Sequence, residues 1–576
     1  MPIASKITRY LAFDPQLSPL YHDLTIGKGK LGGKARGLLF AEQALHRSND
    51  PLFNRVAVPK TFFVATGVFE DFVSQNQLRG IVDSGRDYEQ IEAAFTKGVF
   101  TPTIREQLAQ LLDEFSSPLT VRSSSVLEDN LRYSFAGKYL TIFVTNNGTR
   151  EERLAELEQA VKLVFASIYS PNAVEYRRKH GLHGDKMAVM IQQLTGKERG
   201  SLFYPEISGV GFSKNYRRWS KEVRKEDGVI RLVFGLGTRC VGREYARTFS
   251  LTDLNLRPEG HAPWAIAKYS QERFDVLDLA GGRAEVFNIN QKLSILKYHP
   301  CFSQYAQVYR VDDAHIEDIK EDEPPQLNPG DKIVFTFQNF PRLHPDFFRL
   351  INTLMATLEE ELGLPVDIEF TYEPEEKLFT LVQMRPLPSY EEYRAVQIPA
   401  SLRPEAILLR GNRMLATGIL LGVTRLVYVD PYLYQQTADK RSVAREVERI
   451  NRRMDGERYI LVGPGRWGST KAELGVPVGY SQISNAGLIV ELGIQEANFV
   501  PELPYGTRFF HDLEVDGILY LSVFDTTQSN VFNSYWLRSR SALAEPTGHP
   551  AVSIYSGLFN AYLDGERRIG CVTAHN

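Results

Sequence analysis

The feature that most restricts the fold is a pair of segments in which apolar and polar residues alternate. Residues 366–370 read Val-Asp-Ile-Glu-Phe, and the strand-like run 378–385 ends in Val-Gln-Met-Arg, with Glu-Pro-Glu between the two segments at 373–375. A period of two sends successive side chains to opposite faces of a strand, and a short turn between two such strands joins them. The alternation therefore predicts a β-hairpin with one apolar and one polar face.

The polar face of this hairpin carries residues suited to phosphate chemistry. Asp367 and Glu369 share a face of the first strand, and Gln383 and Arg385 share a face of the second. Oxygen ligands of this kind suit Mg²⁺ that bridges nucleotide phosphates, and an arginine can stabilise a phosphoryl group in transfer. The alternative is a hairpin whose polar face is simply solvated.

A second candidate for anion binding is the segment Gly32-Gly33-Lys34, which runs into a helical pattern. Glycines let backbone N–H groups approach an anion, a helix start adds positive dipole, and Lys34 adds a full charge. The segment is not a Walker A loop, because Lys28 stands where that motif needs glycine and Ala35 where it needs Ser or Thr. A purely structural turn before a helix fits it as well.

A third candidate begins at Arg122, which ends a short strand-like run and carries a planar, permanently charged fork. Residues 134–138, Ser-Phe-Ala-Gly-Lys, read as a small-residue loop whose amides could fold over phosphates. The alternative is an arginine in a surface ion pair, followed by an ordinary turn.

The chain as a whole predicts an α/β (α+β) protein of more than one domain, since 576 residues exceed one ordinary core. Four prolines interrupt regular structure between 386 and 404, so we place the main boundary there and expect domains at 1–390 and 391–576. Periodicity and stop signals predict helices over 151–168 and 346–362 and a buried strand over 186–194.

Composition excludes several classes of function. A net charge of −3 gives no overall reason to expect nucleic acid as a partner. The three cysteines have no metal-binding spacing, the N-terminus lacks the continuous apolar core of a signal peptide, and no apolar stretch is long enough to span a membrane. We expect a cytoplasmic protein that binds neither nucleic acid nor membrane.

Taken together, the segments resemble the ATP-grasp nucleotide-binding region of phosphoenolpyruvate synthase, pyruvate phosphate dikinase and their relatives, which include rifampin phosphotransferase and plant glucan water dikinase. The matching pieces follow one another in family order over roughly two thirds of the chain. They are Gly32–Ala35, Val121–Ser124, Glu128-Asp129, Ser134–Gly137, Phe165–Pro171, Ala173–Arg177, Met187–Gln193, Ser208–Ser213, Gly235–Gly237, Asp367–Glu369 and Val382–Pro386.

The resemblance implies a role for each matching residue and ATP and Mg²⁺ as cofactors. Lys34 and Arg122 would contact the phosphates, and Arg385 would lie at the reacting phosphates, which makes these three the catalytic set. The remaining implied roles are a phosphate-covering loop at Ser134, Ala136 and Gly137, an adenine-bordering strand at Gln192 and Gln193, and Mg²⁺ ligation by Glu369 and Gln383 with support from Asp367.

The chain departs from the family in two ways. It lacks the catalytic-histidine segment Thr-Ser-His-Ala, and the 190 residues after Pro386 cannot hold both that domain and the phosphoenolpyruvate-binding barrel. The expected function is thus a Mg-ATP-dependent phosphotransferase whose acceptor, a small molecule or a protein, is unidentified. The alternatives are an ATP-binding regulatory or partner-binding module and the nucleotide-binding subunit of a split dikinase, partnered by a separate phosphohistidine-domain protein.

The C-terminal third has one conspicuous motif, Gly463-Pro464-Gly465-Arg466-Trp467-Gly468. It could present Arg466 to an anion or an acceptor, or it could be a turn that holds Trp467 in the core. Among the histidines, His511 is the one to test as a phosphate carrier, although its aromatic neighbours also suit a packed histidine.

Overall fold

The computed structural model describes residues 10, 12–15, 24–128, 137–215, 223–224, 226–241, 245–320, 325–387, 396, 398–399, 402–414, 417–469, 471–497, 499, 509–510, 513, 516–541, 544–565 and 567–575. The chain divides into two compact units, Met1–Ser389 and Tyr390–Asn576. Each unit has its own hydrophobic core, and no core cluster of the described residues combines side chains from both.

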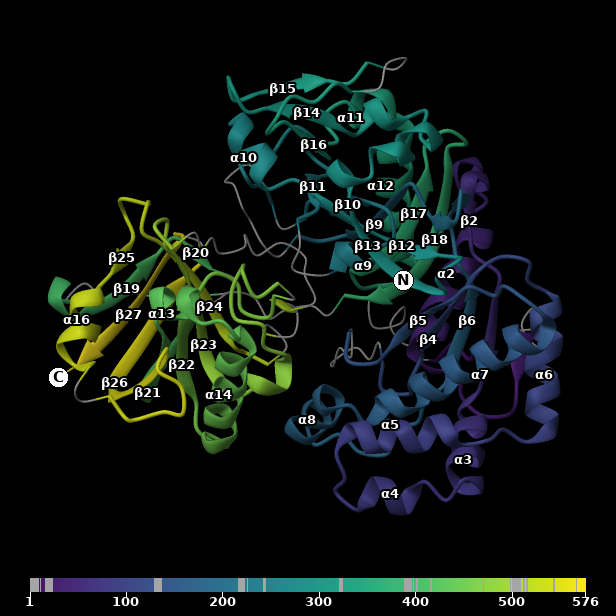
Figure 1. The fold of residues 1–576 in the computed structure, drawn as a ribbon, viewed down its shortest axis with the longest axis horizontal. Coiled ribbons are helices and arrows are strands. Elements are labelled where there is room, and N and C mark those ends of the chain that lie inside the picture. The colour runs from purple at the N-terminus through teal and green to yellow at the C-terminus, as the bar shows by residue number, and fades with distance from the viewer. Residues whose placement is uncertain are drawn as a thin grey trace. The chain divides into compact units, whose positions relative to one another are not determined.

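The N-terminal part of unit 1 contains a five-stranded sheet in the order β1-β3-β6-β4-β5. Helices α3 to α8 belong to the same part of the unit (Figure 1). Only β1 and β3 pair in parallel, and the other neighbours are antiparallel. The strands are β1 (Thr25–Ile26), β3 (Thr61–Val64), β4 (Leu119–Ser123), β5 (Thr141–Val144) and β6 (Val189–Gln193), and the helices are α2 (Gly32–Ser48), α3 (Thr66–Gln75), α4 (Arg79–Asp83), α5 (Tyr88–Lys97), α6 (Pro102–Asp113), α7 (Arg150–Ala166) and α8 (Pro171–Lys179).

Local sequence explains how the long helix of this part begins. The Thr149 hydroxyl accepts a hydrogen bond from the Glu152 N–H, and the Glu152 carboxylate accepts one from the Thr149 N–H, so α7 starts at a capping box. The helix then buries one side against β4 and β5. The helix predicted over 151–168 is confirmed, with its last residues in a 3₁₀ turn, and the buried strand predicted over 186–194 is β6.

The second part of unit 1 is built on a six-stranded sheet in the order β11-β10-β9-β17-β18-β2. Helix α12 (Pro345–Leu362) packs on its apolar face and ends at Gly363, whose φ of +76° suits a residue without a side chain. The predicted hairpin and the helix predicted over 346–362 are both confirmed. The strands are β2 (Val56–Ala57), β9 (Ile207–Phe212), β10 (Val229–Phe234), β11 (Arg247–Ser250), β17 (Val366–Glu373) and β18 (Leu378–Pro386).

Two smaller antiparallel sheets, in the orders β13-β12-β8-β7 and β15-β14-β16, complete unit 1. Their aromatic side chains join the core of the six-stranded sheet around Phe234, which stacks on Phe335 at 4.8 Å. The elements are β7 (Lys197–Arg199), β8 (Leu202–Tyr204), β12 (Arg273–Asp278), β13 (Arg283–Asn288), β14 (Gln307–Arg310), β15 (His315–Asp318), β16 (Lys332–Val334), α9 (Thr238–Val241), α10 (Pro263–Lys268) and α11 (Phe340–Leu343).

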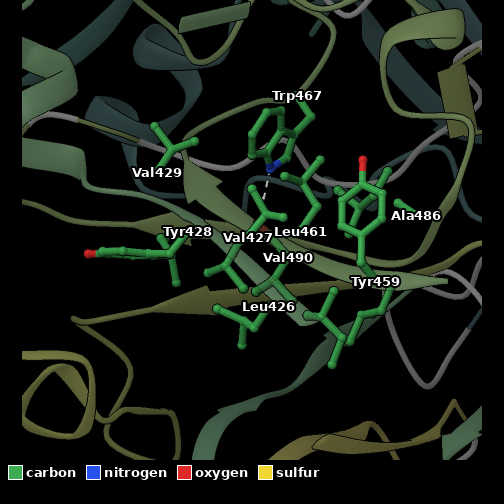
Figure 2. Close-up of a cluster of buried hydrophobic side chains, with 14 of the residues drawn as sticks. Leu426, Val427, Tyr428, Val429, Tyr459, Leu461, Trp467, Ala486 and Val490 are labelled. Carbon is green, nitrogen blue, oxygen red and sulfur yellow. Dashed lines mark hydrogen bonds between the residues drawn. The ribbon is translucent and has the colours of Figure 1, made fainter. Parts of the chain in front are cut away.

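Unit 2 is a nine-stranded sheet in the order β20-β24-β23-β22-β21-β26-β27-β19-β25. Strands β21 to β24 run parallel, and their apolar residues form the core around Trp467, whose indole N–H donates to the Val490 carbonyl at 3.1 Å (Figure 2). The elements are β19 (Ile407–Gly411), β20 (Arg413–Met414), β21 (Gly418–Val429), β22 (Tyr459–Pro464), β23 (Ala486–Gly493), β24 (Leu519–Phe524), β25 (Val531–Phe532), β26 (Val552–Asp564), β27 (Ile569–His575), α13 (Pro431–Gln436), α14 (Lys440–Arg453) and α16 (Ser534–Ser539).

Both units therefore mix helices with sheets, and the predicted α/β fold class is confirmed. Within the part of the chain that the structure describes, no helix combines the length and apolarity that a membrane crossing would need.

Candidate functional site

The hairpin of β17 and β18 pairs its polar residues in register. Asp367 lies opposite Arg385, and Glu369 lies opposite Gln383, directly before a β-bulge. Directly opposed residues face the same side of a sheet, so these four side chains share one face. Ile368 belongs to the core on the other face, as the alternation of the sequence predicts.

Arg122 reaches this polar face from the end of β4 in the other sheet. Its Nη2 donates to Glu369 Oε2 at 2.6 Å and to Gln383 Oε1 at 2.6 Å. The Arg122 side chain is 7% exposed, and that of Glu369 is 21% exposed. A guanidinium fork can contact several acceptors at once, and here one fork joins two sheets that are far apart in sequence.

Gln192 of β6 supports Arg122 from the side. Arg122 Nη1 donates to Gln192 Oε1 at 3.4 Å, and Gln192 Nε2 donates to Thr61 Oγ1 at 3.1 Å and to the Val382 carbonyl at 3.3 Å. Gln192 is buried, whereas Gln193 is exposed, because neighbouring residues of a strand point to opposite faces. Arg122, Gln192, Glu369 and Gln383 thus form one cluster of hydrogen-bonded side chains, and Gln193 lies outside this cluster.

Arg385 is held by its cross-strand partner. Its Nε donates to Asp367 Oδ2 at 2.6 Å, and its Nη2 makes a second contact with the same oxygen. The Asp367 side chain is 3% exposed and that of Arg385 13%. In this structure Asp367 is therefore the ion-pair partner of Arg385.

Lys34 lies on the first turn of α2 and reaches the last residue of β4 and the segment that follows this strand. Its Nζ donates to Ser123 Oγ at 2.8 Å and to Glu128 Oε1 at 2.5 Å. Ser123 follows Arg122 directly in the chain. The Lys34 ammonium is therefore held at the end of the strand that also carries Arg122.

The two glycines before Lys34 pack against protein rather than leaving all their amides to an anion. Gly32 has a φ of +83°, and a Cβ there would lie 1.6 Å from the Ser124 carbonyl oxygen. The Gly33 N–H donates to the Ser125 carbonyl at 3.0 Å, and the Ala35 N–H donates to Ser124 Oγ at 3.0 Å. The Gly-Gly turn is therefore held by contacts with protein backbone and side chains, while the Lys34 ammonium is paired with Ser123 and Glu128.

Helix α2 is brought against the hairpin by Gly37. A Cβ at this position would lie 2.0 Å from the Met384 carbonyl oxygen, between Gln383 and Arg385. Because glycine has no side chain, the helix that carries Lys34 can approach the backbone of β18.

Ser134 and Ala136 lie outside the described residues. Gly137 is exposed, with a φ of +74°, and it precedes the buried Tyr139. The Tyr139 hydroxyl donates to Asp185 Oδ2, and the Leu127 N–H donates to Asp185 Oδ1 at 3.3 Å. Asp185 thus ties together two chain segments that flank residues 129–136, and burial raises the pKa of its carboxyl group.

The structure adds two residues, Glu128 and Arg231, to which the sequence analysis gave no role. Glu128 belongs to the motif Glu128-Asp129, and its contact with Lys34 is seen only in the folded chain. Arg231 of β10 is buried and lies opposite Val210, which lies opposite Glu369, so it shares their face two strands away. Strand pairing that joins distant segments gives no local sequence signal.

Burial raises the pKa of the Cys240 thiol to about 12. The nearby charge of Arg231 lowers this pKa and that of Glu369 raises it, but burial has the largest effect. A thiol with such a pKa stays protonated at neutral pH, so Cys240 is no candidate for a nucleophile.

The donors that could hold a metal ion are the side-chain oxygens of Asp367, Glu369 and Gln383. Among the described residues, no group of three or more His, Cys, Asp and Glu side chains is arranged to hold a metal. Two carboxylates and an amide oxygen on one face do fit a hard cation such as Mg²⁺, which usually takes one or two protein carboxylates and completes its shell with water and phosphate oxygens.

The glycine-rich motif of unit 2 buries its central residues. Arg466 and Trp467 are both 0% exposed, and the Trp467 N–H donates to Glu491 Oε1 at 2.9 Å. The motif therefore holds Trp467 in the core, and Arg466 is not presented to solvent. His511 lies outside the described residues.

Comparison with known proteins gives a family match for the larger part of the chain. Residues 28–405 match the family model described as pyruvate phosphate dikinase, AMP/ATP-binding domain. The chain is 31% identical over 163 residues to the uncharacterized phosphotransferase YvkC of Bacillus subtilis, 25% over 187 residues to the prodigiosin synthesizing transferase PigC of Serratia marcescens, and 21% over 360 residues to a probable phosphoenolpyruvate synthase of Methanocaldococcus jannaschii.

These alignments cover 27%, 32% and 62% of this chain, in the same order. They cover only 17%, 19% and 24% of the relatives. The chain thus matches less than a quarter of the length of each of these relatives.

Proposed function

The chain belongs to the pyruvate phosphate dikinase AMP/ATP-binding domain family, and from that premise we propose that it is a Mg-ATP-dependent phosphotransferase acting on an unidentified acceptor. Its relatives include a protein named as a phosphotransferase and one named as a phosphoenolpyruvate synthase, which supports a reaction that moves a phosphoryl group. The observation that carries the proposal is the contact of Arg122 with Glu369 and Gln383, because it joins a cation and two oxygen donors across two sheets.

In this proposal the basic residues position and neutralise the triphosphate. Lys34 and Arg122 contact phosphate oxygens, and Arg385 stabilises the charge of the phosphoryl group in transfer. Asp367 accepts the Arg385 Nε–H at 2.6 Å and so fixes the plane of that guanidinium. Such positioning supplies much of the catalysis in phosphoryl transfer, since the protein has little covalent chemistry to perform.

The metal ligands of this proposal are Glu369 and Gln383. When bound, Mg²⁺ would supply positive charge to the phosphate oxygens. Glu369 would then have two cationic neighbours, the metal and Arg122, and Arg122 orients its carboxylate through the 2.6 Å contact. Gln192 orients Arg122 through its amide oxygen and borders the adenine, while Gly137 belongs to the loop that covers the phosphates.

The regulatory alternative keeps the same nucleotide site without a reaction. Glu369, Gln383 and Arg385 occur together in this chain, and simple binding would not require the full set of groups at the reacting phosphates. This favours an enzyme. The subunit of a split dikinase differs only in its acceptor, which would be a histidine on a separate chain.

The experiment is an ATP-consumption assay that separates AMP from ADP, run with Mg²⁺ and with or without pyruvate and candidate phosphocarrier proteins. AMP would mark dikinase chemistry, and ADP would mark single phosphoryl transfer. Either product should disappear in Glu369→Ala and Arg385→Ala. A protein that binds ATP but consumes none with any acceptor would favour the regulatory alternative, and an activity that survives both substitutions would contradict the proposed site.

A further inference from the structure

Glu128 occupies a buried position next to Lys34 and is neither a phosphate contact nor a metal ligand of the proposed site. Its side chain is 0% exposed. Oε1 accepts hydrogen bonds from Lys34 Nζ at 2.5 Å and from Ser123 Oγ at 3.0 Å, and Oε2 accepts one from the Ser125 N–H at 2.8 Å. Both carboxylate oxygens are therefore fixed by groups of the same strand end that also carries Arg122.

Lys34 is anchored to this strand end at two levels. Its neighbours Gly33 and Ala35 donate their backbone N–H groups to Ser125 and Ser124, which fixes the helix start. Its ammonium donates to Ser123 and Glu128. A lysine ammonium has three N–H donors, so two of them point to protein acceptors and set the direction of the third.

We propose that Glu128 is a positioning residue that holds the Lys34 ammonium in the direction of a nucleotide phosphate; the inference rests on the proposed function. A lysine side chain has four rotatable bonds and is strongly hydrated, so a free ammonium would sample many positions. A buried carboxylate in direct contact restricts the ammonium to one position and offsets the cost of removing its charge from water.

The carboxylate has an opposing effect, because its negative charge also repels phosphate. The geometry decides between the two effects. Glu128 Oε1 contacts the ammonium directly at 2.5 Å and Oε2 accepts from the Ser125 N–H, so the charge of the carboxylate is paired with Lys34 and both of its oxygens are hydrogen-bonded to protein donors. Orientation of the lysine is then the larger contribution, and loss of Glu128 should weaken ATP binding.

The test is a double-mutant cycle in the full-length chain, with MgATP affinity measured by titration calorimetry. Glu128→Gln and Lys34→Met should each raise the Kd about tenfold, the size expected for one hydrogen bond between charged groups. Once Lys34 is Met, adding Glu128→Gln should change the Kd less than about twofold, because the residue it orients is gone. A merely structural glutamate would weaken binding equally in both backgrounds, and that result would overturn the proposal.

Glu156→Gln is the matched control. Glu156 lies in the same part of unit 1 and accepts hydrogen bonds from the Thr145 and Asn146 N–H groups. It is not one of the hydrogen-bond partners of Lys34, which are Ser123 and Glu128. Its substitution should leave the Kd for MgATP unchanged.

Ser123→Ala is a second variant, in case Glu128→Gln does not fold. It removes the hydroxyl that contacts both Lys34 and Glu128 and should raise the Kd about two- to fivefold only while Lys34 is present. An equal effect in the Lys34→Met background would overturn the proposal as well. Absence of MgATP binding by the wild-type chain would instead refute the proposed function itself, so the two failures are distinguishable.

Discussion

Arg122 is the residue on which the geometry of the proposed site depends. One guanidinium contacts Gln192, Glu369 and Gln383, which belong to three strands of two sheets. Removing one member of a buried charge pair leaves the other without compensation, which costs more than the pair contributes when intact. Stability and nucleotide binding should therefore both respond to this residue.

Replacement of Arg122 by Met should lower the free energy of unfolding by about 3 kcal/mol, because it leaves Glu369 in a largely buried place without its cation. Urea denaturation followed by circular dichroism measures this change. Arg105→Met is the matched control, since Arg105 also pairs with two glutamates but on the exposed surface of α6, where solvent screening leaves only a small loss. Equal losses in the two variants would contradict the account.

His344 gives unit 1 a predictable dependence on pH. Its Nε2 lies 2.5 Å from Gln304 Oε1, an oxygen that accepts, and its Nδ1 lies 3.3 Å from the Tyr372 hydroxyl, which can donate to Nδ1 when the ring is neutral. Burial lowers the pKa of His344 to about 4, while an unfolded histidine has a pKa near 6.5.

Between these two values the unfolded chain binds more protons at this residue than the folded chain, so stability should fall as the pH drops from about 6.5 to about 4. His344→Gln should remove this part of the decline. Thermal unfolding of both proteins across that pH range checks the prediction, and identical pH profiles would contradict it.

Among the elements, α2 links Lys34 to the polar hairpin of β17 and β18, because this helix carries Lys34 and packs on β18. The contact depends on Gly37, whose missing side chain leaves room for the Met384 carbonyl oxygen. In a helix interior, alanine is normally about 1 kcal/mol more favourable than glycine, so any loss at this position must come from the contact.

Gly37→Ala should destabilise the protein by about 2 kcal/mol or more, since its Cβ would lie 2.0 Å from backbone, and should weaken MgATP binding by moving α2 away from β18. Gly80→Ala in α4 is the control, because nothing lies within 4 Å of the added Cβ, and it should stabilise by up to about 1 kcal/mol. Differential scanning calorimetry of both variants decides, and stabilisation by Gly37→Ala would refute the packing argument.

The hairpin of β17 and β18 was predictable from sequence because each strand alternates with a period of two and a short turn lies between them. The alternation places Asp367 and Glu369 on one face of β17 and Gln383 and Arg385 on one face of β18, and the strand pairing brings these two faces to the same side of the sheet. The pairing of Arg122 with this hairpin could not be derived from periodicity, because it joins segments from different sheets. The same holds for the proposed positioning role of Glu128, which depends on how α2 meets the end of β4.

At the scale of the whole molecule, the two units carry different kinds of sequence information. Unit 1 contains most of the residues 28–405 that match the family model. In unit 2 the sequence of the glycine-rich motif around Arg466 fits a structural turn at least as well as an anion-binding loop. The structure favours the turn, because burial of Trp467 depends on side-chain packing between β22 and β23 that no local pattern reveals.

The central claim is that basic and acidic groups from distant parts of unit 1 surround one Mg-ATP complex. Titration calorimetry of the full-length chain with ATP, with and without Mg²⁺, tests it most directly. The account predicts saturable binding that Mg²⁺ strengthens and that Glu369→Gln makes at least about tenfold weaker in the presence of Mg²⁺. A wild-type chain that binds no ATP, or a Glu369→Gln variant that binds MgATP as tightly as the wild type, would contradict it.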